Sequence, residues 1–174
     1  MKSLCTIGCL LGFASLAVTA GASEQTDRIN KLATETQSAL KSGNYKRVLE
    51  LTYPKVVENM GGVDQGAASM QKAFQKAKIV EAESDEPGEI VTSGDNQFSV
   101  VPTKMLIQVK GKSIRLKGFL LAVSEDGGKH WTFLDAEGLY QGGADPKEKA
   151  KTYGLELPDD LTLPEHEQPV VESE

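Results

Sequence analysis

The chain has 174 residues, of which 19 are basic and 25 acidic, giving a formal net charge of −6 at pH 7. Seven of the acids lie in residues 156–174, which contain no Lys or Arg, so the chain before them is close to neutral. A neutral body with an acidic end lacks the clustered basic side chains that bind phosphate backbones or anionic lipids, which argues against nucleic acid and membrane surfaces as partners.

Residues 1–22 have the composition of a cleavable export signal. A lysine at the second position supplies the basic start, residues 4–18 form the apolar middle, and Ala-Gly-Ala at 20–22 is a small-residue cleavage site. We expect cleavage after Ala22, or else after Ala20. The mature protein is then expected to be exported, to the periplasm or to the outside of the cell.

The two cysteines of the chain, Cys5 and Cys9, both lie in this signal segment. The mature chain is therefore expected to lack disulfides, thiol nucleophiles and thiolate metal ligands. A retained membrane anchor and a lipid attached to Cys9 are the alternatives. The apolar run is shorter than the roughly 20 residues that span a bilayer, and most of it follows Cys9, whereas a lipidated cysteine should follow its apolar run.

Three amphipathic helices are predicted at the start of the mature chain, over residues 24–42, 44–60 and 63–77, because apolar residues recur there at helical spacing. Glycines follow the first two helices as stop signals. Pro54 lies inside the second helix and cannot donate a backbone hydrogen bond, so we expect a kink near Tyr53 or a fresh helical start.

From residue 78 the apolar period changes to two and turn residues separate short segments, which predicts an antiparallel meander. The expected strands are residues 79–83, 89–92, 97–109, 113–124 and 131–136. In the fourth strand, alternate residues from Ile114 to Ala122 form an apolar face that we expect the helices to cover. The opposite face mixes charged and apolar side chains, so we expect a homodimer contact there, with a solvated sheet face as the alternative.

Residues 140–154 are expected to hold a short polar helix that begins after Asp145 and ends at Gly154. Residues 155–174 form an acidic tail in which the pattern LxLP occurs twice. Its prolines oppose a helix, and we expect disorder from residue 165 onward. A solvated tail is the favoured interpretation, and an adaptor that binds a partner through the LxLP tail is the alternative.

One turn matches the pattern SxDxGxxW, which occurs as a hairpin in sialidases and in many other exported proteins. Its residues are Ser124, Asp126, Gly128 and Trp131. We interpret it as a structural brace in which Asp126 accepts backbone hydrogen bonds, a glycine takes a positive φ and Trp131 packs beside the strand. Sialidase-like activity is disfavoured, because propeller enzymes carry several copies at regular spacing and this chain has one.

Metal and histidine chemistry find little support in the sequence. The two histidines, His130 and His166, lie in the hairpin and in the acidic tail. A tetrahedral metal site needs more fixed donors than a flexible tail provides, and the glycines lack the spacing of a phosphate-binding loop. We therefore expect no metal, nucleotide or other cofactor.

The order of three helices followed by a curved antiparallel sheet resembles the nuclear transport factor 2 superfamily, which has a cystatin-like cone fold. Local residues over 24–139 are also similar to small exported bacterial members of unassigned function. The matching positions are Gly43-Asn44-Tyr45, Tyr53-Pro54, Gly61-Gly62, Val100-Val101-Pro102, residues 119–124, Gly128, Trp131, Phe133 and Asp135.

This resemblance implies an α+β domain over residues 23–139, in which three N-terminal helices pack on a curved antiparallel sheet, or cone. It also implies a mostly apolar ligand pocket, and dimerisation through the outer sheet face is common in this superfamily. The residues expected to line the pocket are Tyr53, Val57, Phe74, Leu116, Leu120 and Phe133.

Enzymes of the superfamily pair His with Asp, or combine an Asp base with Tyr and a protonated Asp. This chain departs from both patterns, because no histidine is placed to enter the cone. Asp135 and Tyr53 are the acid and phenol that we can place toward its interior, for proton transfer and oxyanion stabilisation. The simpler interpretation is that Asp135 caps a strand end and Tyr53 packs at the kink.

The leading hypothesis is therefore an exported, non-catalytic and homodimeric module that holds a small apolar ligand or a partner peptide in its cone. The alternative is a small isomerase or lyase that uses Asp135 and Tyr53. Pocket geometry separates the two hypotheses, because the enzyme requires both side chains to face one cavity.

Overall fold

The computed structural model describes residues 17–143, 145–165 and 167–172, with side chains from residue 21 onward. Most of the predicted signal segment, including Cys5 and Cys9, lies outside the described residues. Helix α1 (Ala17–Lys41) already includes the predicted cleavage sites. Among the described residues, no helix combines the length and apolar composition that crossing a bilayer requires.

In the described part of the chain, four α-helices precede the sheet: α1, α2 (Tyr45–Leu51), α3 (Pro54–Asn59) and α4 (Val63–Ala73). A 3-10 turn, η1 (Phe74–Lys76), follows α4. The second predicted helix is divided because Thr52 takes an extended conformation and Pro54 begins α3 as its first residue. Proline is suited to that position, where no backbone donor is needed. The described residues before the sheet therefore form four α-helices where we expected three, because a new helix starts at Pro54.

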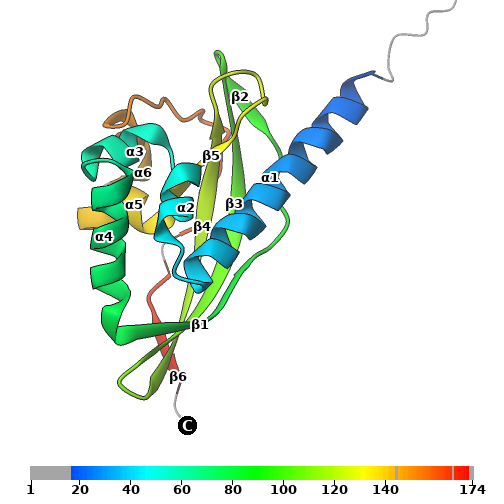
Figure 1. Ribbon diagram of the computed structural model, residues 1–174. Helices are drawn as coiled ribbons and strands as arrows, with labels where there is room; N and C mark the ends of the chain where they lie inside the picture. Colours follow the sequence, from blue (N-terminus) through cyan, green and yellow to red (C-terminus); the bar gives the residue numbers. More distant parts are fainter. Residues whose placement is uncertain (1–16, 144, 166, 173–174) are drawn as a thin grey trace, which may run out of the picture.

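Antiparallel strands follow the helices and form one sheet. Their bounds are β1 (Ala77–Ser84), β2 (Val91–Ser93), β3 (Asn96–Val109), β4 (Lys112–Ser124), β5 (Thr132–Asp135) and β6 (Val170–Glu172). The main order is β1-β3-β4-β5, with β2 paired to β3 and β6 paired to β4. In Figure 1, α1 runs obliquely across β3 and β4. The predicted α+β class, with helices packed on an antiparallel sheet, is confirmed.

The side of the sheet that faces α1 and α2 is the helix face. Alternate residues of β4 and β5 point to it, because antiparallel pairing places Leu120 opposite Asp135 and Ala122 opposite Phe133. Its core contains Ile29, Ala33, Leu51, Val101, Leu120, Ala122, Trp131 and Phe133. The apolar stripe of α1 is buried here, as helical spacing predicts.

The other side of the sheet is the outer face, and the chain covers it with its own C-terminal half. The segments above it include α5 (Ala136–Tyr140), η2 (Gln141–Gly143) and α6 (Pro146–Lys151). Its core joins β-strand residues to the C-terminal segment: Phe98, Phe119, Leu121, Val123, Leu134, Leu139, Tyr153, Leu155, Leu157 and Leu161. Leu155, Leu157 and Leu161 belong to the two LxLP copies, so these copies pack against the rest of the same chain.

The C-terminal segment also corrects the expectation of a disordered tail. β6 pairs with the start of β4, where Arg115 contacts Glu172 at 2.7 Å, and Lys117 contacts Glu167 at 3.1 Å. Leucine burial anchors the segment before these residues, because each buried leucine contributes roughly 1.5 to 3 kcal/mol, and the later residues are held by strand pairing and ion pairs. The outer face that we expected to form a dimer contact is therefore largely covered by the chain itself, and homodimerisation stays a prediction.

Candidate functional site

A cavity of about 290 Å³ lies between the helix face of the sheet and the helices. Its floor is formed by β3, β4 and β5, and its walls come from α1, α2, α4 and η1. Apolar side chains make up most of the lining: Leu40, Val48, Met70, Phe74, Met105, Leu116, Phe119, Leu120, Phe133 and Ala136. The lining of the cavity is therefore mostly apolar, with polar and charged side chains among it.

The cavity brings together four of the six residues that the sequence placed in a pocket. Phe74, Leu116, Leu120 and Phe133 line it, whereas Tyr53 and Val57 do not. Val57 lies in α3, which starts anew at Pro54. The sequence analysis treated residues 44–60 as one helix with a single apolar stripe. Because α3 begins anew at Pro54, the apolar residues after the break no longer lie on the same face as those before it.

Tyr53 points to the outer face because of a bond to the sheet edge. Thr52 forms a parallel bridge with Phe133, and the Tyr53 backbone N–H donates to the Phe133 carbonyl at 2.8 Å. Neighbouring residues of an extended segment point to opposite sides. Thr52 accordingly lines the cavity, and the Tyr53 ring packs in the outer-face core.

The Tyr53 hydroxyl has a partner on that outer side. It donates to Oε1 of Glu125 at 3.0 Å. Burial raises the pKa of Tyr53 to about 12, and the carboxylate of Glu125 adds to the shift. The structure thus does not bring Tyr53 and Asp135 together, and the acid and phenol that an isomerase would need do not share the cavity.

Asp135 does line the cavity, at the end of β5. Its Oδ1 accepts a hydrogen bond from the backbone N–H of Gly138 at 2.6 Å, so the side chain is the N-cap of α5. Asp135 is exposed to solvent, although the protein packed around its carboxyl group desolvates it in part. Burial raises the pKa of Asp135, the N–H of Gly138 opposes the rise, and the charge of Glu137 adds to it.

Gln37 is one of the polar residues of the cavity that the sequence analysis missed. It lies on α1 and lines the cavity, and only 6% of its surface is exposed. None of the described residues forms a hydrogen bond with its amide, which is open to solvent in the cavity. The signal was present in the sequence, because Gln37 follows Ile29 and Ala33 at intervals of four on the buried stripe of α1.

The charged rim of the cavity includes part of the C-terminal segment. Lys117 and Glu167 both line it and form an ion pair with each other at 3.1 Å. Glu137 of α5 also lines the cavity. A segment that we expected to be solvated thus contributes to the site.

The SxDxGxxW residues form a braced turn between β4 and β5, away from the cavity. Asp126 Oδ1 accepts from the backbone N–H groups of Lys129 at 3.0 Å and His130 at 2.9 Å. Gly128 has a φ of 85° and donates to the Ser124 hydroxyl at 2.9 Å. These bonds lower the pKa of Asp126, the backbone N–H of His130 contributing most. Trp131 is buried and donates to the Gly128 carbonyl at 3.1 Å.

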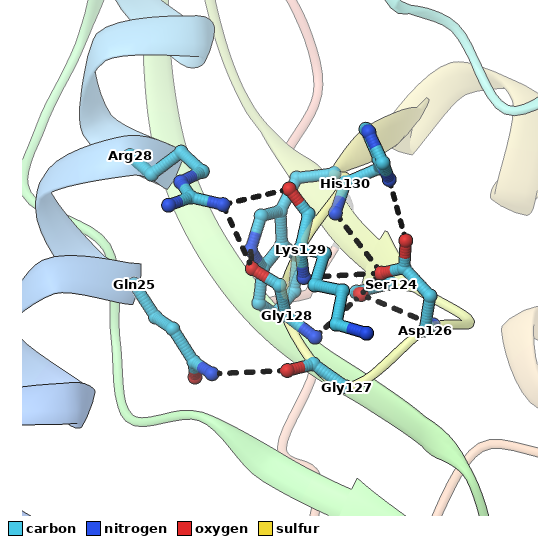
Figure 2. Close-up of polar contacts among 9 residues, drawn as sticks. Gln25, Arg28, Ser124, Asp126, Gly127, Gly128, Lys129 and His130 are labelled. Carbon is cyan, nitrogen blue, oxygen red and sulfur yellow. Dashed lines mark hydrogen bonds and ion pairs between the residues drawn. The ribbon is translucent and has the colours of Figure 1, made fainter.

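Helix α1 holds this turn from outside, as Figure 2 shows. Arg28 donates to the carbonyl oxygen of Lys129 at 2.7 Å, and Gln25 donates to that of Gly127 at 3.2 Å. The turn therefore fixes the N-terminal half of α1 to the β4–β5 edge. Its contacts are those of a structural element.

No group of three or more His, Cys, Asp and Glu side chains able to hold a metal ion occurs among the described residues. His130 is exposed and contacts Asp126 in the braced turn. His166 lies outside the described residues. The polar groups of the cavity are suited to hydrogen bonding and to binding charge.

Comparison with family models, curated proteins and solved structures found no significant match to this chain.

Proposed function

We propose that this protein is an exported, non-catalytic module that binds a small, mostly apolar ligand in the cavity between α1 and the sheet. The observation that carries the proposal is a mostly apolar cavity into which Gln37, with only 6% of its surface exposed, brings an amide that has no partner among the described residues. A ligand that pairs with this amide replaces its contact with water by a hydrogen bond that contributes about 0.5 to 1.5 kcal/mol.

The size and lining of the cavity indicate the kind of ligand. Its volume of about 290 Å³ is near the lower end of the range of roughly 300 to 1,000 Å³ for small-molecule sites. A single ring or a short alkyl chain with one polar end fits this space better than a partner peptide. Apolar walls would supply the affinity, and the few polar groups would fix the orientation.

Placement in the nuclear transport factor 2 superfamily, with its curved cone, is part of this proposal. Its support is the order of helices before an antiparallel sheet and the cavity on the helix face. The isomerase or lyase alternative loses support, because the Tyr53 hydroxyl donates to Glu125 on the outer face. Homodimerisation would need a surface other than the covered outer face, and native mass at micromolar concentration tests it.

The proposal is tested by titrating the mature protein with the neutral probe 2-phenylethanol and following backbone amide shifts by NMR. We expect the shifts to concentrate at residues that line the cavity. Shifts that are absent, or spread over the surface, contradict the proposal.

Gly118 offers a matched pair of variants for this test. It lines the cavity, and an added Cβ would lie 3.6 Å from both Ala136 Cβ and Thr103 Oγ1, which is ordinary contact. Gly118→Ala should therefore retain probe binding, whereas Gly118→Leu should fill the cavity and abolish it. Circular dichroism checks that both variants fold. Equal binding by the two variants would place the probe elsewhere.

A further inference from the structure

One carboxylate oxygen of Asp135 is a free acceptor on the lining of the cavity. Oδ1 is engaged by the Gly138 N–H at 2.6 Å, while Oδ2 accepts no hydrogen bond from any described residue. Asp135 is exposed, and it lines the cavity beside the apolar side chains of Leu120 and Phe133. A positive ligand group that enters the cavity could therefore reach Oδ2 and pair with the carboxylate.

No described basic side chain in the cavity is available to Asp135. The charged lining residues are Asp135, Glu137, Glu167 and Lys117, and Lys117 pairs with Glu167 at 3.1 Å. The charge that acts on Asp135 is that of Glu137, which raises its pKa further. Asp135 therefore has no basic partner among the described lining residues, and its charge favours a positive ligand group.

Two further acceptors accompany the carboxylate. Gln37 lines the cavity, its amide has no partner among the described residues, and 6% of that residue is exposed. The Thr103 hydroxyl also lies in the lining. An ammonium group has three donors and no acceptor, so it can satisfy several oxygens at once.

From this arrangement we propose that the cavity selects apolar molecules that carry a positively charged amino group, with Asp135 as the counter-ion and Gln37 as a second acceptor. The inference rests on the proposed ligand-binding function and names the chemical class of its ligand. An anionic ligand would meet like charge in the cavity. A neutral ligand would leave Asp135 without an opposite charge.

Three probes with a similar apolar body test the selection: 2-phenylethylamine, 2-phenylethanol and phenylacetate. At neutral pH the amine is positively charged, the alcohol is neutral and phenylacetate is negatively charged. Isothermal titration of the mature protein should give an affinity for the amine about tenfold or more above that for the alcohol, because a hydrogen bond to a charged group contributes more than a neutral one. Phenylacetate should not bind measurably.

Asp135→Asn is the central variant, because asparagine keeps the shape and the N-cap acceptor of Asp135 while removing its charge. We expect it to lose the preference for the amine and to keep the affinity for the alcohol. Asp160→Asn is the matched control for net charge, since Asp160 is exposed in the C-terminal segment and outside the lining. It should retain the full preference.

Gln37→Leu provides a second variant if Asp135→Asn fails to fold. It removes one acceptor and fills the same space with apolar atoms, so it should weaken amine binding several-fold while alcohol binding changes less. Equal affinity of the unchanged protein for amine and alcohol overturns the charge selection but leaves the proposed ligand-binding function standing. Failure of all three probes to bind contradicts both.

Discussion

The backbone N–H of Tyr53 donates to the carbonyl oxygen of Phe133 at 2.8 Å, which attaches the break between α2 and α3 to the edge of β5. This bond determines what each neighbouring side chain contacts. Thr52 and Phe133 face the cavity, and Tyr53 packs among Phe119, Leu121 and Leu134 on the outer face. The same short segment therefore helps to build both cores of the protein.

Tyr53→Phe should lower the free energy of unfolding by about 0.5 to 1.5 kcal/mol, because it removes one hydrogen bond, to Glu125, and keeps the buried ring. It should leave the binding of 2-phenylethanol unchanged, since Tyr53 does not line the cavity. Urea denaturation and NMR titration measure the two effects. A loss of probe binding with an intact fold would contradict our placement of Tyr53.

The same variant should alter the response to alkali. The folded pKa of Tyr53 is about 12 against an ordinary value of 10.0. A raised folded pKa gives stability that is fully present below the unfolded pKa and is lost as pH rises through the folded pKa. The unchanged protein should therefore lose stability between pH 10.0 and about 12, and Tyr53→Phe should lose less. Comparison of the two proteins removes the contribution of lysines that titrate in the same range.

Leu155 should be essential to the stability of the covered outer face. It is fully buried beside Phe119 and Leu121, so Leu155→Ala should cost about 2 to 5 kcal/mol. Leu163 is the control, because it is a leucine of the other LxLP copy that is only partly buried. Leu163→Ala should cost clearly less in urea denaturation. Similar, small losses for both variants would indicate that the C-terminal segment does not pack as described.

Truncation after Gly154 distinguishes this structure from the adaptor hypothesis. An adaptor tail could be removed without affecting the fold. Here the removal would expose the apolar surface that Leu155, Leu157 and Leu161 cover, so we expect a large fall in Tm. A truncated chain with unchanged Tm would restore the adaptor hypothesis.

The fold was predictable where periodicity extends over many residues. The stripe of α1 and the alternation in β3 and β4 each span several turns or residue pairs, and the structure follows them. Short elements lack that signal. The five residues of α5, Ala136–Tyr140, are too few to show a period, and the LxLP leucines show no regular spacing that would reveal which surface they cover.

The candidate site was predictable to the same extent. Phe133 and Leu120 followed from strand alternation, which also turns Asp135 toward the helix face. Tyr53 was misplaced because a helical pattern was continued across Pro54, whereas a bridge to Phe133 sets its direction. That bridge joins residues far apart in the chain, so no local pattern encodes it. Gln37 was overlooked because a single polar residue on an apolar stripe resembles the border of that stripe.

The braced turn should depend on the charge of Asp126. Asp126→Ala removes the acceptor for the backbone N–H groups of Lys129 and His130 and should lower Tm. Asp126→Asn keeps an acceptor and should lower Tm less. Thermal unfolding followed by circular dichroism measures the order, and a reversed order would show that these bonds do not brace the turn.

Protonation of Asp126 at low pH should also lower the stability of the protein. The bonds in the turn hold the folded pKa of Asp126 below its ordinary value of 3.8. A lowered folded pKa gives stability that is present above the unfolded pKa and lost as pH falls through the folded pKa. Tm of the unchanged protein should therefore fall more steeply below about pH 4 than that of Asp126→Asn. Parallel curves would contradict the lowered pKa.

Export should remove residues that the fold does not need. If the signal is cleaved after Ala22, the lost residues of α1 whose exposure the structure describes, Gly21 and Ala22, are both exposed. Gln25 and Arg28, which hold the braced turn, are retained. The intact mass of the exported protein should correspond to a start at Ser23, or at Gly21 after the earlier cut. Its Tm should equal that of the precursor, because no contact with the turn is lost.

A chain that starts at Ile29 lacks both contacts and should melt at a lower temperature. If that shorter chain were as stable as the mature protein, the attachment of α1 to the turn would contribute nothing to the fold. An exported protein of full precursor mass would instead contradict the signal prediction.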